Sequence, residues 1–225
     1  MRIRNDVHAA LLAALLASLS CGSAAQPAPQ PAPQPAPQPA PQPAPPPPPR
    51  AAPSFDCSQD RASSVERRIC SDEKLAALDR GLAGAYAAAL AKATGADASA
   101  LETAQRAFIK SRNDCWKTTD VQECVENGYA HRTAELQARY GLLKAIGSGR
   151  YQCPSAAQEV TAEFFTTDPP TAMIQYAGVT QLMFSAPSGS GARYTGGNRQ
   201  FWEHQGVALV YWGGPRASEM RCPKL

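Results

Sequence analysis

The placement of the cysteines most limits how this chain can fold. The sequence has seven cysteines, and Cys21 lies in the N-terminal segment, so six remain after it (seven minus one). They fall two by two along the chain, as Cys57 and Cys70, Cys115 and Cys124, and Cys153 and Cys222. Six cysteines allow fifteen pairings, and we favour the local one because each pair lies within one segment. The last bond then closes most of the C-terminal segment, which is worth about 4 kcal/mol in the chain-entropy model.

A structural zinc site is the alternative use of these cysteines. The sequence has no Cys-x-x-Cys, and its histidines beyond the N-terminal segment are His131 and His204. Structural zinc needs four cysteine or histidine ligands, usually at close spacing. We therefore expect disulfides, no metal and no cofactor, in a chain that leaves the reducing cytoplasm.

Residues 1–25 have the layout of a secretory signal peptide. Arg2 and Arg4 precede an apolar run over residues 9–19, which is too short to span a bilayer. Two endings remain open: Cys21 follows a permissive lipobox and becomes a lipidated N-terminus, or cleavage occurs after Ala25. Both predict export, to the periplasm or, with a lipid anchor, to the outer membrane.

Residues 26–50 are rich in proline. A Pro-Ala-Pro-Gln repeat occupies most of this stretch and ends in a run of prolines. Because proline lacks the backbone N–H that helices and sheets need, we expect an extended polyproline II tether. At about 3.1 Å per residue its reach is on the order of 75 Å. Two roles fit such a tether: it lifts a folded head away from a membrane, or it serves as a plain spacer.

Helix start signals recur over residues 51–149. Two stretches have the spacing of a capping box, Ser63-x-x-Glu66 and Ser99-x-x-Glu102. Asp72 and Asp120 are candidate N-caps for two further helices. These signals predict a small four-helix domain pinned by two disulfides.

Apolar spacing supports the same four-helix interpretation. Residues 75–89 and 121–143 each keep their apolar side chains on one helix face. Gly95 and Gly147 are expected at helix ends. The charged residues Arg106, Lys110 and Arg112 beside Asp114 favour a solvated helix surface, and a binding face is the alternative.

From residue 150 onward the pattern is that of short strands. Segments rich in β-branched and aromatic residues alternate with Pro, Gly and Ser turns, at 159–165, 171–176, 179–184, 200–204, 207–212 and 218–222. Such spacing predicts a closed or nearly closed antiparallel barrel over residues 150–225, with Trp202, Tyr211 and Trp212 filling or flanking its interior. The predicted fold class is α+β, a disulfide-pinned helical domain followed by a small antiparallel β-barrel.

One loop of the barrel segment has an unusual composition. Ser188-Gly189-Ser190-Gly191 is followed by Arg193 and Tyr194, and then by Phe201-Trp202-Glu203-His204. Interleaved glycines free the backbone for positive φ, and short serine side chains leave it uncovered. The loop suits a protruding turn that offers N–H groups and hydroxyls to a partner; a plain surface turn is the alternative.

This segment resembles the C-terminal pattern of bacterial inhibitors of c-type lysozyme, the membrane-bound (MliC) and periplasmic families. They carry Ser-Gly-Ser-Gly-x-x-Tyr and then Phe-Trp-x-Lys-Gly-x-x-Ala on a small antiparallel barrel. The first element is complete here, whereas His204 and Gln205 stand in place of the family's lysine and glycine. Tyr151-Gln152-Cys153 and Cys222 also fit, so the resemblance covers about the last third of the chain.

The resemblance implies a protein inhibitor that plugs the active-site cleft of a c-type lysozyme. In that family the second loop serine and the lysine bond to the catalytic carboxylates, and these positions fall on Ser190 and His204. The implied partner-binding residues are Ser188, Gly189, Ser190, Gly191, Arg193, Tyr194, Trp202 and His204. A histidine with the ordinary pKa of about 6.5 is mostly neutral at pH 7.5 and shorter than lysine. Position 204 is therefore the main departure from the family.

The helical segment resembles a second family, the LprI-type domain. The residues that carry this resemblance are Phe55-Asp56-Cys57, residues 64–72 and 75–79, Gln105-Arg106-Ala107-Phe108, Arg112-Asn113-Asp114-Cys115 and Cys124. The resemblance implies a helical extracytoplasmic module, some members of which are associated with lysozyme inhibition. It implies the fold and the cysteines but no inhibitory residue.

Catalysis is not expected. Ser190 lacks the Gly-x-Ser-x-Gly elbow because position 188 is serine. Glu159, Asp168 and Glu203 are scattered acids rather than the positioned pair that a glycosidase needs.

The net charge of the barrel segment favours neither nucleic-acid binding nor strong electrostatic steering of a protein partner. Residues 151–225 hold Arg193, Arg199, Arg216, Arg221 and Lys224 against Glu159, Glu163, Asp168, Glu203 and Glu219. Their sum is zero, so the barrel offers little negative field to a basic lysozyme, and we expect no nucleic-acid partner. The alternative function is a non-catalytic envelope module that binds glycan or another envelope protein.

Overall fold

The computed structural model describes residues 51–59, 62–154, 158–213 and 217–225. The predictions for the signal peptide, the lipidation of Cys21 and the tether over residues 26–50 lie outside the described residues. Within the described ranges, no helix has the length and apolar character that a membrane crossing requires.

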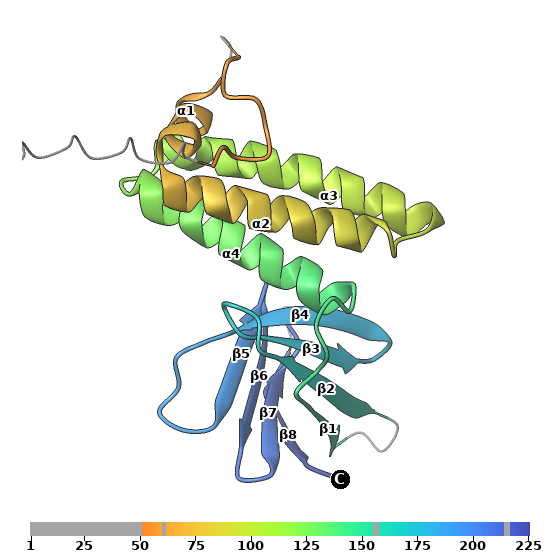
Figure 1. The fold of residues 1–225 in the computed structure, drawn as a ribbon. Helices are drawn as coiled ribbons and strands as arrows, with labels where there is room; N and C mark the ends of the chain where they lie inside the picture. The colour runs from red at the N-terminus through yellow and green to blue at the C-terminus, as the bar shows by residue number, and fades with distance from the viewer. Residues whose placement is uncertain (1–50, 60–61, 155–157, 214–216) are drawn as a thin grey trace, which may run out of the picture. The chain divides into compact units, whose positions relative to one another are not determined.

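The first part of the described chain is helical (Figure 1). Its elements are α1 Ser64–Ser71, α2 Glu73–Leu90, α3 Gly95–Asn113, the 3-10 turn η1 Asp114–Lys117 and α4 Val121–Arg139. Helix α4 packs against both α2 and α3, while α1 packs against α2 and α3. The four-helix prediction is confirmed.

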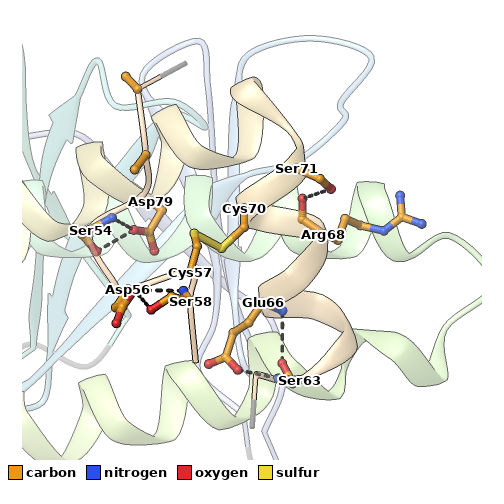
Figure 2. The surroundings of a disulfide bond; sticks show 12 residues. Ser54, Asp56, Cys57, Ser58, Ser63, Glu66, Arg68, Cys70, Ser71 and Asp79 are labelled. Carbon is orange, nitrogen blue, oxygen red and sulfur yellow. Dashed lines mark hydrogen bonds between the residues drawn. A yellow bond between two sulfur atoms is a disulfide. The ribbon is translucent and has the colours of Figure 1, made fainter. Parts of the chain in front are cut away.

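Three of the predicted caps form the expected hydrogen bonds. Ser63 and Glu66 make a reciprocal capping box at the start of α1, as Figure 2 shows. Asp72 accepts from the backbone N–H of Leu75, and Asp120 caps α4 in the same way. These side chains satisfy donors that would otherwise lack a partner in the first helical turn.

The prediction for Ser99 and Gly95 is wrong. Helix α3 begins at Gly95, so Ser99 lies within the helix and its carbonyl accepts from the hydroxyl of Thr103. Gly95 opens this helix at a φ of +52°, after Thr94 in an extended conformation. Asp97 lies in the first turn, where the helix dipole favours negative charge.

The end of α4 also differs from the prediction. The helix ends at Arg139 with Tyr140 as its C-cap, and Gly141 follows with a φ of +56°. A glycine in this left-handed conformation commonly ends a helix. Gly147, which we expected at a helix end, is instead the first residue of a strand.

The helical core uses the predicted apolar faces. Leu75 and Leu82 of α2 pack with Val125 and Leu136 of α4, and all four are buried. Two disulfides pin this region, Cys57–Cys70 and Cys115–Cys124. Both pairings agree with the sequence prediction.

A buried polar network corrects the expectation for Arg112. This side chain is 5% exposed and donates to the hydroxyl of Tyr129 at 2.9 Å and to Asp79 at 3.5 Å. Burial raises the pKa of Tyr129, so its hydroxyl stays protonated and donates to Asp79 at 2.8 Å. Asp79 also accepts from the backbone N–H and hydroxyl of Ser54, which ties the N-terminal segment to α2 (Figure 2). Arg112 therefore belongs to the fold rather than to a solvated face.

The second part of the described chain is an antiparallel sheet of eight strands in sequence order. The strands are β1 Gly147–Gln152, β2 Glu159–Phe165, β3 Thr171–Tyr176, β4 Val179–Ser185, β5 Ala192–Gly196, β6 Arg199–His204, β7 Val207–Tyr211 and β8 Met220–Pro223. A bridge between Tyr151 and Lys224 and a hydrogen bond from Leu225 to Arg150 join the first strand to the last. The sheet is thus a nearly closed barrel, as predicted.

Two of these strands were not predicted. Strand β1 is rich in glycine and polar residues, and the short β5 has only Tyr194 and Thr195 as strand-forming residues, so neither stood out as the other six did. Their partners impose the strand conformation: β1 pairs with β2 along its whole length, and β5 pairs with β6.

The barrel core contains Tyr151, Ile174, Met183, Phe201 and Val210, each of which is almost fully buried. The buried Cys153–Cys222 disulfide lies in the same core and has the predicted pairing.

The two tryptophans of the barrel behave differently. Trp212 packs against the core, as expected, whereas its counterpart on β6, Trp202, does not take part in it. The buried neighbour Phe201 points inward, and side chains alternate along a strand, so Trp202 points outward. The prediction that Trp202 fills or flanks the interior is wrong.

Candidate partner-binding site on the barrel

The Ser188–Gly191 loop connects β4 to β5 (Figure 1). Its base is closed by a hydrogen bond of 2.8 Å from the N–H of Ala186 to the carbonyl of Arg193. Within the loop, the hydroxyl of Ser188 donates to the carbonyls of Ser190 and Gly191, at 3.0 and 3.1 Å. A serine side chain thus satisfies loop carbonyls and folds the turn on itself.

Gly191 is the position in this loop where glycine is required. Its φ is +70°, a conformation that other residues adopt at a cost. A Cβ at this position would overlap the backbone carbonyl oxygen of Glu203 and lie 3.1 Å from the Cα of His204. Gly189 has open space around it. The close approach of Gly191 brings the loop onto the end of β6.

Trp202 joins the loop to β6. Its indole Nε1 donates to the carbonyl of Ser190 at 2.8 Å, although twelve residues separate the two in sequence. The register brings them together because Trp202 pairs with Arg193, two residues after Gly191. The ring therefore supports the loop from its outward side.

His204 is the last residue of β6, two residues beyond Trp202 and on the same strand face. Both side chains line a hollow of about 190 Å³ on the outside of the barrel. The other residues of its lining are Gln205, Val207, Leu209 and Arg221. The structure thus gathers Ser190, Trp202 and His204 along one edge of the barrel.

The turn after His204 explains why the resembled family has glycine at the next position. Gln205 and Gly206 have φ values of +52° and +77°, between the paired residues His204 and Val207. Two consecutive positive φ values define the two-residue hairpin turn that matches strand twist and favours glycine. The carboxylate of Glu203 accepts from the N–H of Gly206 at 3.1 Å and stabilises the turn.

Arg193 and Tyr194 make contacts within the barrel. Arg193 donates two hydrogen bonds to the side-chain carbonyl of Gln200, at 2.9 and 2.6 Å. Tyr194 packs beside Phe164 with ring centroids 5.5 Å apart, and burial raises its pKa. These two residues shape the base of the loop.

The sequence did not point to Leu209 or Arg221, because their place in the hollow depends on strand register. The sequence predicted strands over 207–212 and 218–222, but it did not indicate which residues lie opposite Leu209 and Arg221 in the sheet. Among the described residues there is no cluster of three or more His, Cys, Asp or Glu side chains that could hold a metal ion.

Comparison with known proteins matches each part of the chain to a family. Residues 151–218 match the membrane-bound lysozyme-inhibitor of c-type lysozyme (MliC), and residues 56–136 match lysozyme inhibitor LprI. The fold and the two matches define a fusion of two domains that both come from lysozyme-inhibitor families.

The relatives are the Lipoprotein LprI proteins of Mycobacterium bovis and of two strains of Mycobacterium tuberculosis. Each is 36% identical over 165 residues, which are 73% of this chain and 82% of the relative. The chain belongs to the LprI family. No solved structure matches it.

Proposed function

We propose that this protein inhibits a c-type lysozyme by inserting the Ser188–Gly191 loop into the active-site cleft of the enzyme. Membership of lysozyme-inhibitor families supports the partner. The observation that carries the loop assignment is the hydrogen bond from Trp202 to the carbonyl of Ser190. It fixes the loop before any partner binds.

A preformed loop suits inhibition because it loses little conformational freedom on binding. Gly191 and Trp202 hold the loop from two sides, and Ser188 closes it internally. Each flexible group that is already ordered spares part of the entropic cost of association. The loop can then present its outer hydroxyl and N–H groups at fixed positions.

The chemistry of contact rests on two side chains. The hydroxyl of Ser190 donates to a cleft carboxylate, and a hydrogen bond to a charged group contributes about 1.5–3 kcal/mol. His204 takes the place of the family's lysine beside the second carboxylate. Ser188, Gly189, Gly191, Arg193 and Tyr194 build the surface from which Ser190 projects, and Trp202 adds its outward face.

We place the protein in the cell envelope, in the periplasm or on the outer membrane. Three disulfides need an oxidising compartment, and the relatives are named lipoproteins. A lipid on Cys21 and the proline-rich tether over residues 26–50 would hold the folded head at a distance from the membrane.

We also propose a division of labour. Residues 150–225 form the inhibitor domain, which acts by binding and without catalysis. Residues 51–149 form the helical LprI-like domain, in which we find no inhibitory motif.

Lysis of a cell-wall suspension by a c-type lysozyme tests the proposal. Residues 51–225, with their disulfides formed, should slow lysis, and residues 150–225 should retain most of the effect. Ser190→Ala should weaken inhibition roughly tenfold to a hundredfold, the equivalent of one hydrogen bond to a carboxylate. Ser148→Ala is the control, since Ser148 is an exposed serine on β1.

An inhibition constant that is the same for Ser190→Ala and Ser148→Ala would remove Ser190 from the mechanism. No inhibition by any form would favour an envelope module that binds glycan or another protein.

A further inference from the structure

The residues lining the outer hollow form a row across three strands. Trp202 of β6 lies opposite Leu209 of β7, and Leu209 lies opposite Arg221 of β8. Directly opposed residues of an antiparallel sheet share one face. The inward positions beside this row are the buried residues Phe201 and Val210, so Arg221 points outward together with Trp202.

Arg221 differs from the other arginines of the barrel in its contacts with the described residues. It is exposed and makes no hydrogen bond or ion pair with any described residue. Arg150 is paired with Glu159, and Arg193 is bonded to Gln200. Arg199 donates to Gln181 and lies over the ring of Trp212 at 4.7 Å. Arg221 therefore differs from these barrel arginines in keeping its donors available.

We propose that Arg221 is a second cationic anchor for the carboxylates of the bound lysozyme. This inference rests on the function proposed above. The hollow puts Arg221 on one continuous surface with His204 and Trp202, and Trp202 in turn holds the carbonyl of Ser190. The anionic groups that Ser190 approaches thus meet a guanidinium on the far side of the hollow.

The chemistry of the guanidinium suits this place. Arginine stays charged at all relevant pH values and binds a carboxylate through two parallel hydrogen bonds. Histidine carries full charge only at acidic pH. Arg221 supplies the permanent charge that the lysine supplies in the resembled family. It lies beyond residues 151–218, the range that matches the family model, so the match does not include it.

The test compares Arg221→Gln with Lys224→Gln in residues 51–225, measuring inhibition of a c-type lysozyme at low and moderate salt. Both variants remove one positive charge from the same end of the chain, but Lys224 does not line the hollow. Arg221→Gln should weaken inhibition about tenfold and reduce its salt dependence. Lys224→Gln should stay within about twofold of the parent. Arg221→Lys should recover part of the loss, because it keeps the charge but not the planar fork.

Four outcomes decide the inference. A specific loss in Arg221→Gln, with unchanged thermal unfolding and partial recovery in Arg221→Lys, supports the anchor. Equal losses in Arg221→Gln and Lys224→Gln would reveal a general charge effect and overturn it. Full inhibition by Arg221→Gln, while Ser190→Ala is impaired, would overturn the anchor and leave the proposed function standing. A parent protein that does not inhibit would overturn both.

Discussion

Two glycine-to-alanine variants in the Ser188–Gly191 loop test whether the close approach of Gly191 holds this loop against β6. Gly191→Ala places a Cβ against the carbonyl oxygen of Glu203 at a φ of +70°. Gly189→Ala makes the same chemical change two residues earlier, where nothing lies within 4 Å. The two variants have the same composition and differ only in where the methyl group falls.

The structure sets the size of the expected effect. A left-handed conformation costs an alanine about 1–2 kcal/mol relative to glycine. Relief of the overlap must displace the loop from β6, which loosens the terminal pair Ala192 and Glu203, and a lost hydrogen bond costs about 0.5–1.5 kcal/mol. Gly191→Ala should therefore lower the free energy of unfolding of the barrel by about 2–3 kcal/mol. Gly189→Ala should change it by less than about 0.5 kcal/mol.

Chemical denaturation measures these differences, and hydrogen exchange of the amides in β5 and β6 locates them. Inhibition measured on the same samples should fall about tenfold or more for Gly191→Ala, because the displaced loop no longer presents Ser190 in place. The control value for Gly189→Ala is its unfolding midpoint rather than its inhibition constant, because the added methyl group can contact the bound lysozyme directly. Equal unfolding free energies for the two variants would refute the claim that Gly191 holds the loop against β6.

Two further predictions concern β6. Trp202→Phe keeps an aromatic ring but removes the N–H that bonds to Ser190, so inhibition should weaken about three- to tenfold with little change in thermal unfolding; an unchanged inhibition constant would mean that the bond does not matter for binding. His204→Lys should tighten binding by roughly tenfold, since lysine restores the longer cationic side chain that the resembled family carries at this position beside the cleft carboxylates. An affinity for lysozyme that does not improve in His204→Lys would place His204 outside the contact.

Much of the fold followed from local sequence. Ser63 and Asp72 cap helices because their side chains bond to N–H groups three residues away, an interaction that sequence spacing specifies. The strand prediction for residues 171–176 agrees with β3 because strand-forming residues fill it. Local signals failed at Ser99, because α3 begins four residues earlier, at Gly95, and its N-cap Thr94 makes no side-chain capping hydrogen bond that the spacing could have indicated.

The Ser188–Gly191 loop was recognisable from its composition, but the contacts that hold it against β6 were not. The bond between Trp202 and Ser190 joins residues that only the pairing of β5 with β6 brings together. The same pairing makes a strand of residues 192–196, a segment too short for its sequence to predict one. Long-range contacts of this kind depend on register, and a shift of one residue would turn every side chain to the other face.

The order of the two folds and the presence of a glycine-serine loop could be predicted from the sequence alone, because they depend on residues close together in the chain; the sequence favoured the cysteine pairing but left fifteen possibilities open. Only the tertiary structure decided that Trp202 faces outward, that Arg112 is buried and that Arg221 lines the same hollow as His204. Each of these depends on which strands or helices become neighbours, and that choice is made by the whole packed core rather than by any one segment.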